Sequence, residues 1–309
     1  MNRLWSVSRE VARAVKARRP VVALETTLVT HGLPRPEGLA VAAELEERVR
    51  RGGAVPATIG VLGGRLRVGL TEDELARLAG APGVAKLNLS NLAAHLASGS
   101  AGSTTVAATV VAAHGAGIEV LATGGIGGVH REAAQTGDVS ADLTALARHP
   151  VAVVCAGAKA VLDLPRTLEA LETLGIPVYG LGTDRFPAFY RRDSGLPVDH
   201  RFDTAPELAA GVRAHFDLGL GSGVVVANPV PAEDEMPAAL YDASLERAMA
   251  DARQKAVRGR DLTPFLLERL RELTEGRSVF SNRALLRANA AAGAALAVAL
   301  AAGRRRARG

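Results

Sequence analysis

Short apolar runs alternate with amphipathic segments along most of this chain, and that alternation limits the folds open to it. The apolar runs fit buried strands at residues 20–24, 57–62, 66–68, 118–123, 151–155, 177–181 and 223–227. Helical patterns lie between and after them, at residues 38–51, from the capping-box sequence at Thr71, at 104–115, after Lys159 through Leu171, and at 240–255, 264–273 and 283–302. Strands that alternate with helices build a largely parallel sheet with helices on both faces. The sequence therefore predicts an α/β protein of three α/β/α layers, in one domain over residues 1–303.

The basic excess of the chain is concentrated near residue 309. The formal net charge is +5, and Arg304, Arg305, Arg306 and Arg308 supply four of those charges. The rest of the chain carries no basic stripe interleaved with aromatic residues, which disfavours a nucleic-acid groove. We predict that residues 304–309 form a solvated, disordered tail, with a phosphate or polymer contact as the less favoured alternative.

The single cysteine and the N-terminal sequence bear on the compartment. Cys155 has no partner for an internal disulfide, which is usual in a reducing compartment. Arg3, Arg9 and Arg13 interrupt the N-terminal segment, which lacks the apolar stretch of a signal peptide. The apolar segment 290–303 is too short to span a bilayer and is predicted to be a packed helix. We expect a cytoplasmic protein with neither a membrane nor a nucleic acid as partner.

Four polar residues stand where predicted strands end, namely Glu25, Thr123, Lys159 and Asn228. The carboxyl ends of parallel strands meet at one edge of a sheet, and binding sites lie there. We therefore expect these four groups to share one cleft.

Lys159 is the first catalytic candidate. Its neighbours Ala156, Gly157, Ala158 and Ala160 offer few polar groups to solvate an ammonium. Desolvation favours the neutral amine, which is a nucleophile for carbonyl carbons. From position alone, a surface lysine in the first turn of a helix is the commoner arrangement.

Three carboxylates are further candidates. Glu25 is partly shielded by aliphatic neighbours and could act as a general acid or base, with a structural hydrogen-bonding role as its alternative. Asp138 and Asp142 are four residues apart, so on one helical turn they would share a face and hold a divalent ion directly or through water. Too few oxygen ligands surround them for an all-protein cage, so such an ion would keep several waters. The alternative is that Asp138 or Ser140 caps a helix while Asp142 lies at the surface.

A glycine-rich segment, residues 124–128, follows the strand at 118–123. Its backbone N–H groups could cradle a phosphate, with His130 and Arg131 nearby. It is not a dinucleotide-binding fingerprint, because His130 occupies the third glycine position. The chain also lacks a P-loop, an H-E-x-x-H motif and paired cysteines, which excludes NAD enzymes, P-loop NTPases and zinc proteases of those types.

Taken together, these segments resemble the pseudouridine-5'-phosphate glycosidase family, which includes indigoidine synthase A-like proteins. The matching segments run in order over nearly the whole chain, at residues 23–27 with 31–34, 53–58, 104–107, 122–130, 140–143, 154–159, 183–184 with 186–190, 227–231 and 263–267. Each segment is weak alone, and their shared order makes the combination specific. The resemblance implies an indigoidine synthase A-like fold with a mixed, largely parallel central sheet.

The resemblance also implies a catalytic pair and a metal. Lys159 matches the nucleophilic lysine that captures ring-opened ribose at C1' as a Schiff base, and Glu25 matches the proton donor. Asp138 matches the aspartate that holds Mn²⁺ through its water shell. A C–C glycosidic bond has no heteroatom leaving group, so its cleavage needs a neutral amine, an acid/base and an anion site.

Substrate contacts follow from the same resemblance. Lys86 matches the phosphate-binding lysine, and the other implied contacts are Val106, Ser140, Ala141 and Asp142, with Thr123 and His130 as further expected ones. The implied reaction is the reversible cleavage of pseudouridine 5'-phosphate to uracil and ribose 5-phosphate, in a homotrimer.

One segment departs from the family pattern. After its lysine the family continues with a serine and an Arg/Asp-rich stretch, whereas here Lys86 is followed by Leu-Asn-Leu-Ser-Asn-Leu at 87–92. This departure motivates a second hypothesis, a lysine-dependent lyase or glycosidase that acts on another C-nucleotide or sugar phosphate, as in the indigoidine pathway. A third is a catalytically silent nucleotide-binding or assembly protein.

Overall fold

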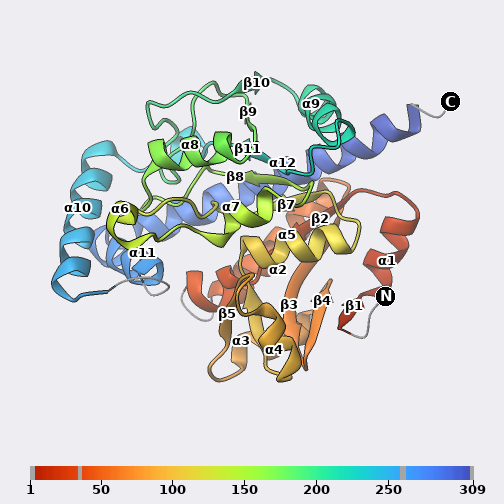
Figure 1. Cartoon of the computed structure of the whole chain (residues 1–309), viewed down its shortest axis with the longest axis horizontal. Coiled ribbons are helices and arrows are strands. Elements are labelled where there is room, and N and C mark those ends of the chain that lie inside the picture. The colour runs from red at the N-terminus through yellow and green to blue at the C-terminus, as the bar shows by residue number, and fades with distance from the viewer. Residues whose placement is uncertain (1–3, 34–36, 258–261, 307–309) are drawn as a thin grey trace.

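One mixed β-sheet forms the centre of the computed structural model, which describes residues 4–33, 37–257 and 262–306 (Figure 1). Its strands are β1 (Trp5–Val7), β2 (Val21–Leu24), β3 (Val55–Leu62), β4 (Arg65–Val68), β5 (Ala85–Leu87), β6 (Gly102–Thr104), β7 (Val120–Ala122), β8 (Ala152–Cys155), β9 (Val178–Leu181), β10 (His200–Phe202) and β11 (Val224–Ala227). They lie in the order β1-β4-β3-β2-β7-β8-β11-β9-β10, and β6 joins both β3 and β5. Of these pairs, β3–β4 and β3–β6 are antiparallel and the others are parallel. The predicted largely parallel, mixed sheet is confirmed.

Helices cover both faces of this sheet. They are α1 (Arg9–Lys16), α2 (Glu37–Arg51), α3 (Glu72–Gly80), α4 (Leu92–Ala97), α5 (Val106–Gly115), α6 (Ala133–Thr136), α7 (Ala141–Leu146), α8 (Leu164–Thr173), α9 (Ala205–Asp217), α10 (Ala238–Gln254), α11 (Leu262–Leu273) and α12 (Arg277–Arg306), with a π-helical turn η1 (Leu28–Gly32) and a 3-10 turn η2 (Ala232–Asp234). The long helix α12 packs on β2, β7 and β8 with α2 and α9 beside it, while α5 and α7 lie on the other face (Figure 1). The three predicted layers are therefore present.

The central strands are built for complete burial. Every residue of β2, β7, β8 and β11 is buried, and these strands consist of valine, alanine and leucine with one cysteine. Small and β-branched side chains suit a sheet that is covered on both faces. Such a core needs few aromatic residues, which agrees with their share of 3%.

Several elements differ from the sequence prediction. The helix expected directly after Lys159 begins only at Leu164, with Asp163 as its N-cap, so Lys159 lies in a loop. The predicted capping box is confirmed, because Thr71 and Glu74 exchange hydrogen bonds at the start of α3. The elements that were not predicted are β1, β5, β6, β10, α1, α4, α6 and α9, while α7 was predicted only as the helix of one alternative. α9 has its own capping box, Thr204 with Glu207, which was a readable signal.

The helix that begins at Arg277 is longer than predicted. It has 30 residues and contains the segment 290–303, so the argument from short length was wrong, whereas the predicted packing is confirmed. By length and composition α12 is the one described helix that could cross a membrane, yet 56% of its most apolar window is buried inside the protein. The predicted disordered tail is also wrong at its start, because α12 continues to Arg306 and Arg304 forms an ion pair with Glu119. Residues 307–309 lie outside the described residues.

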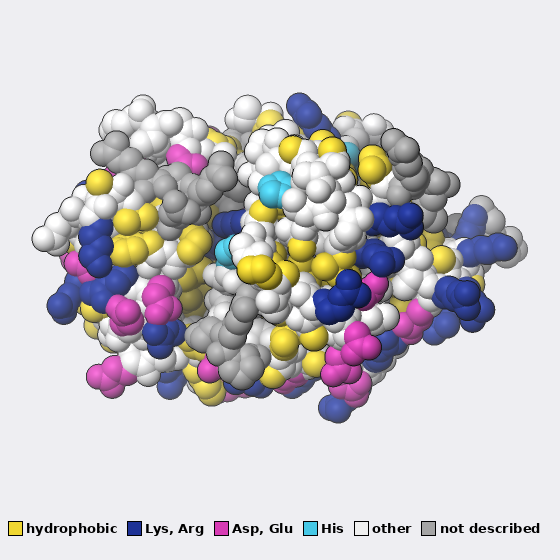
Figure 2. Space-filling view, turned by 90° about the horizontal axis from the view of Figure 1, so that it is seen from below, with side chains coloured by type: hydrophobic (Ala, Val, Ile, Leu, Met, Phe, Trp, Pro, Cys, Tyr) yellow, Lys and Arg dark blue, Asp and Glu magenta, His cyan; other side chains and the backbone are white. Residues whose placement is uncertain are grey.

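Basic and acidic side chains intermingle on the face seen in Figure 2. Ion pairs between Arg50 and Glu10 and between Arg67 and Glu74 join neighbouring elements at the surface. Exposed pairs of this kind add little stability each.

A buried asparagine ties α12 to the end of β7. The Asn289 side chain is fully buried, and its amide N–H donates to the carbonyl oxygens of Thr123 at 2.7 Å and Gly124 at 3.4 Å. Its Oδ1 accepts a hydrogen bond from Asn228 Nδ2 at 2.9 Å. Helix α12 thereby fixes the backbone at Thr123 and Gly124, where the glycine-rich segment begins.

We predict that Asn289→Leu lowers the free energy of unfolding by about 2–4 kcal/mol, because it leaves buried carbonyls without a donor. Urea unfolding followed by circular dichroism measures this loss. Asn228→Ala is the graded control, since it removes only the bond to Asn289 and should cost less than half as much. Equal losses in the two variants, or none, would contradict the assigned role.

Candidate active site

A cavity of about 570 Å³ opens at the carboxyl ends of the central strands. β2 ends directly before Glu25, β7 directly before Thr123, and β8 four residues before Lys159. These strands are neighbours in the sheet, and all three residues line the cavity. The convergence predicted from strand ends is confirmed for them.

Asn228, the fourth strand-end residue, does not join them. It is absent from the described lining of the cavity, and its side chain donates to Asn289 instead. β11 places it one strand beyond β8, where α12 takes up its polar group. The expectation that Asn228 shares the cleft is therefore wrong.

Glu25 is half-buried on the cavity wall, and the Thr123 hydroxyl donates to its Oε1. Burial raises the pKa of Glu25. The Lys159 ammonium, the Thr123 hydrogen bond and the more distant Lys86 oppose that increase, while the Asp142 carboxylate adds to it. A carboxyl group with a raised pKa can hold a proton near neutral pH and deliver it to a substrate.

Lys159 is half-buried in the loop between β8 and α8 and faces the same cavity. Its backbone N–H donates to Ile126 at 3.0 Å, and its carbonyl accepts from Leu162 at 3.0 Å. Gly157 lies in this loop and has a φ of +78°, and a Cβ at this position would overlap the carbonyl oxygen of Pro187. A glycine at 157 thus lets the chain turn and present Lys159 to the cavity. The surface-lysine alternative is not what the fold produces.

The glycine-rich segment supports this loop through part of its backbone. The N–H groups of Ile126, Gly127, Val129 and His130 donate within the protein, to Gly157 O, Asp142 Oδ2, Thr167 Oγ1 and Asp138 O respectively. These four N–H groups are therefore not available to an anion, and a phosphate cradle stays a prediction for the N–H groups of Gly124, Gly125 and Gly128. Gly124, Gly125 and Gly127 contribute to the cavity wall.

Asp142 connects two sides of the cavity. It is 4% exposed, and its carboxylate accepts hydrogen bonds from the N–H of Ala107 and of Gly127, both at 2.8 Å. Ser140 is the N-cap of α7, as one alternative predicted, but Asp142 is not at the surface. The premise that Asp138 and Asp142 share one helical turn is wrong, because α7 begins at Ala141, after Asp138. Ser140, Ala141 and Asp142 all line the cavity.

Asp138 and His130 form a polar pair beside Lys159. His130 Nδ1 lies 3.8 Å from Asp138 Oδ2, and this buried nitrogen has no hydrogen-bond partner among the described residues. Burial lowers the pKa of His130, with Asp138 opposing the decrease and Lys159 and Lys86 adding to it. A neutral imidazole with an unsatisfied nitrogen is suited to a bound water or a substrate polar group.

Lys86 reaches the cavity from β5, and the unusual stretch after it forms the adjoining wall. Asn88 Oδ1 accepts from the N–H and the hydroxyl of Ser90, at 2.9 and 2.7 Å, and Asn91 Nδ2 donates to the Lys86 carbonyl at 3.1 Å. Asn88, Ser90, Asn91 and His95 line the cavity. The departure from the family pattern therefore produces a neutral, polar wall.

Val106 is a core residue and not part of the described cavity lining. It is 1% exposed at the start of α5, and the preceding residue, Thr105, lines the cavity instead. The Val106 side chain is therefore not placed to contact a substrate, and a contact through its backbone stays a prediction.

Sequence reasoning missed an apolar part of the cavity. Leu28 from η1, Leu162 and Phe189 from loops, Leu267 from α11 and Leu286 from α12 line it, together with Asn282. Phe189 has a φ of +61°, which is unusual for a bulky side chain and marks a constrained site residue. The segments 186–190 and 263–267 were recognised by resemblance, but nothing in their pattern predicted a role.

Cys155 ends β8 and is fully buried. Burial raises the pKa of its thiol to about 12. A thiol with so high a pKa is neither a nucleophile nor a metal ligand near neutral pH.

Comparisons with known proteins agree with this geometry. The chain is 50% identical over 300 residues to a pseudouridine-5'-phosphate glycosidase of Caldanaerobacter subterraneus subsp. tengcongensis, covering 97% of this chain and 98% of that one. It is 56% identical over 291 residues to a protein of the same name from Methylobacterium nodulans, covering 94% and 86% of the two chains.

Solved structures give the same picture. The prealnumycin C-glycosynthase AlnA, in complex with ribulose 5-phosphate, superposes with a TM-score of 0.92 at 38% identity, covering 99% of this chain and 100% of that one. An indigoidine synthase A-like protein of Thermotoga maritima gives a TM-score of 0.87 at 36% identity, covering 96% and 97%. The family described as indigoidine synthase A like protein matches residues 10–299. The chain belongs to the indigoidine synthase A-like family.

Proposed function

We propose that this protein is a pseudouridine-5'-phosphate glycosidase, which reversibly converts pseudouridine 5'-phosphate and water into uracil and ribose 5-phosphate. The observation that carries the proposal is the placement of Lys159 and Glu25 in one cavity, close enough for the ammonium to influence the carboxyl pKa. Relatives that share 50% and 56% of its residues over almost the whole chain bear that name, which supports the assignment.

The bond to be broken explains why an amine is needed. In pseudouridine, C1' of ribose is joined to C5 of uracil, and no heteroatom can be protonated to leave. The Lys159 amine bonds to C1' as the ring oxygen departs, which opens the ribose. The C1'–C5 electron pair then passes to C5, which takes a proton from Glu25, while the nitrogen lone pair forms the iminium with C1'. Water hydrolyses the iminium and releases ribose 5-phosphate.

The cavity wall supplies groups for the two ends of the substrate. Lys86, with the neutral groups of Asn88 and Ser90 beside it, is the proposed phosphate anchor. The apolar side chains of Phe189 and Leu162 offer a surface for the uracil ring. Thr123 holds Glu25 in place through its hydroxyl.

A divalent cation, Mn²⁺ by family resemblance, is proposed to bind near Asp138. The donor set fits an ion that keeps its water shell, because Asp138 offers a carboxylate 30% exposed at the cavity and His130 offers an unsatisfied buried nitrogen nearby. Among the described residues, no cluster of three or more His, Cys, Asp or Glu side chains is placed to enclose a metal directly. When bound, the ion would supply positive charge and ordered water for the sugar hydroxyls.

A second candidate is the same lysine chemistry on a different base or sugar phosphate. It is favoured by the neutral stretch at 87–92 and by the 38% identity to AlnA, a C-glycosynthase. Rates with uracil and with other carbon-nucleophilic rings separate the two, since a glycosidase of pseudouridine 5'-phosphate should prefer uracil strongly. The homotrimer remains a prediction that rests on the family resemblance, and the cytoplasmic location remains one that rests on the single cysteine and the N-terminal sequence.

We expect borohydride to trap a ribose phosphate adduct on Lys159 when the protein is incubated with ribose 5-phosphate and Mn²⁺. Lys159→Ala should abolish the adduct and lower turnover about a thousandfold or more, because Lys86, the other lysine of the described cavity lining, is engaged with the phosphate in this proposal. Mass spectrometry of the peptide that contains Lys159 measures the adduct. Lys86→Ala is the control, and it should still form the adduct at higher ribose 5-phosphate. An adduct elsewhere, or none, would refute the covalent step.

We expect Glu25→Gln to lower turnover roughly 100-fold or more and yet stabilise the protein at neutral pH. Because the pKa of Glu25 is raised above 4.5, the folded state holds this proton more tightly than the unfolded chain. That contribution to stability is fully present below pH 4.5 and is lost as pH rises through the folded pKa. The stability gained by the variant should therefore shrink as pH falls, which urea unfolding across the pH range measures.

Glu46→Gln is the matched control for Glu25→Gln. Burial also raises the pKa of Glu46, which accepts a hydrogen bond from Thr58 away from the cavity. It should show a similar pH-dependent stability change with activity retained. A Glu25→Gln variant that is less stable at neutral pH than at pH 4.5, relative to the wild type, would contradict the assignment.

We expect Asp138→Asn to weaken Mn²⁺ binding roughly 10-fold to 100-fold, as is typical for a partner that acts through metal-bound water. Electron paramagnetic resonance of free Mn²⁺ during titration measures the affinity without any turnover. Asp184→Asn, at an exposed carboxylate, is the control and should bind as the wild type does. Equal affinity in all three proteins would remove Asp138 from the metal site.

A further inference from the structure

The loop that carries Lys159 is irregular and depends on contacts from outside. It runs from Ala156 to Asp163 between β8 and α8. Lys159 N–H donates to Ile126, Asp163 N–H donates to Val129 at 2.9 Å, and the Ala156 carbonyl accepts from Phe189 at 3.0 Å. The glycine-rich segment and the Phe189 loop thus hold the two ends of this loop.

The middle of the loop is held by a residue from a distant helix. Tyr241, on α10, donates its hydroxyl to the carbonyl of Ala160 at 3.0 Å. Ala160 directly follows Lys159 and is 1% exposed, while Tyr241 is 7% exposed. Burial raises the pKa of Tyr241 to about 12, so its hydroxyl remains a donor over the working range of an enzyme. Among the described residues, Tyr241 is the recorded partner of this buried carbonyl.

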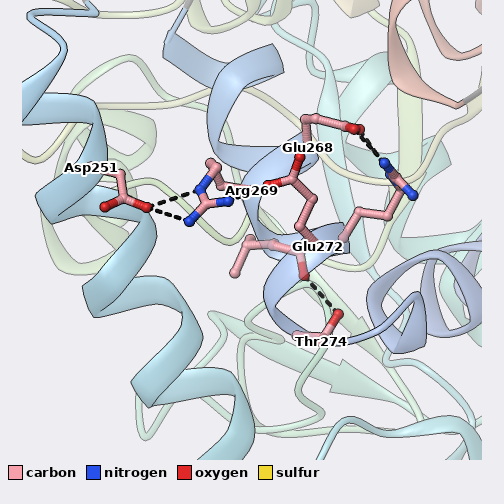
Figure 3. A network of polar contacts seen from close by, with 7 residues as sticks. Asp251, Glu268, Arg269, Glu272 and Thr274 are labelled. Carbon is pink, nitrogen blue, oxygen red and sulfur yellow. Dashed lines mark hydrogen bonds and ion pairs between the residues drawn. The ribbon is translucent and has the colours of Figure 1, made fainter.

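The helix that presents Tyr241 is itself fastened to the cavity wall. Figure 3 shows Arg269 of α11 directed at Asp251 of α10, with its Nε and Nη2 at 2.9 and 2.6 Å from one carboxylate oxygen. On the same helix α11, Thr263, Pro264 and Leu267 line the cavity. α10 and α11 therefore connect the substrate wall to the nucleophile loop.

We propose that Tyr241 is a positioning residue for Lys159, whose hydroxyl fixes the Ala160 peptide and so the direction of the lysine side chain. The inference rests on the proposed role of Lys159 as nucleophile. Without the hydroxyl, the buried carbonyl of Ala160 loses its hydrogen-bond donor. The peptide after Ala160 can then rotate to bring this carbonyl to a different donor. Small displacements of a nucleophile are costly for rate, because attack needs a defined distance and angle.

Tyr241→Phe tests the proposal by removing one oxygen atom. We expect kcat for pseudouridine 5'-phosphate to fall about tenfold while KM stays within about twofold, since the phosphate and base contacts are intact. A second readout needs no turnover: trace acetylation with acetic anhydride, followed by mass spectrometry, gives the reactivity of Lys159 relative to the exposed Lys16. We expect that ratio to change about threefold or more.

Tyr190→Phe is the matched control. Tyr190 is equally buried, packs against Tyr241 with ring centroids 6.4 Å apart, and bonds Ser278 at the start of α12. It should lose similar thermal stability while kcat and the acetylation ratio stay at the wild-type values. Equal effects of the two variants on kcat, or an unchanged acetylation ratio in Tyr241→Phe, would overturn the proposal. If borohydride traps no adduct in the wild type, the Schiff-base chemistry fails, and the acetylation ratio still decides whether Tyr241 positions Lys159.

Discussion

The register between β2, β7 and β8 is the constraint from which the site follows. Leu24 pairs with Ala122, and Ala122 pairs with Val154, so the next residues along the first two strands, Glu25 and Thr123, emerge side by side. Their hydrogen bond is thus a direct product of strand pairing. A slip of one residue would turn one of these side chains to the opposite face of the sheet. Complete burial on both faces makes such a slip costly and keeps the pair together.

The three carboxylates of the cavity lie in three different electrostatic environments. Glu25 is half-buried beside an ammonium, Asp142 accepts hydrogen bonds from two backbone N–H groups, and Asp138 keeps a partly exposed carboxylate. Three carboxylates in one cavity can therefore serve as proton donor, structural link and outer ligand. Environment, and not residue type, separates these proposed roles.

The sequence predicted the elements whose signal is local and strong. Fully apolar strands such as β8 and β11, and the capped helix α3, were found because burial on both faces and a capping box leave a mark in adjacent residues. Three-residue strands such as β5 and β6 carry too little pattern to be seen, and they form because β3 offers β6 a partner and β6 in turn offers one to β5. The convergence of Glu25, Thr123 and Lys159 followed from topology alone.

The wrong predictions share one physical cause, because each concerned which group a polar side chain or a backbone N–H would bond. Asn228 was expected in the cavity and bonds Asn289, more than sixty residues later in the chain. Two N–H groups of the glycine-rich segment, those of Ile126 and Gly127, were expected to be free and are taken up by Gly157 and Asp142. Long-range hydrogen bonds leave no periodic trace in a sequence. The role of Tyr241, 81 residues from Ala160, belongs to the same class.

The burial of Cys155 determines how this residue responds to reagents that attack thiols. A thiol held at the end of β8 with a pKa near 12 stays protonated and sheltered at neutral pH. Alkylating agents and peroxide attack the thiolate form at an accessible surface, so neither has a target at this position. Loss of activity on treatment with a thiol reagent would therefore not be expected to arise at Cys155.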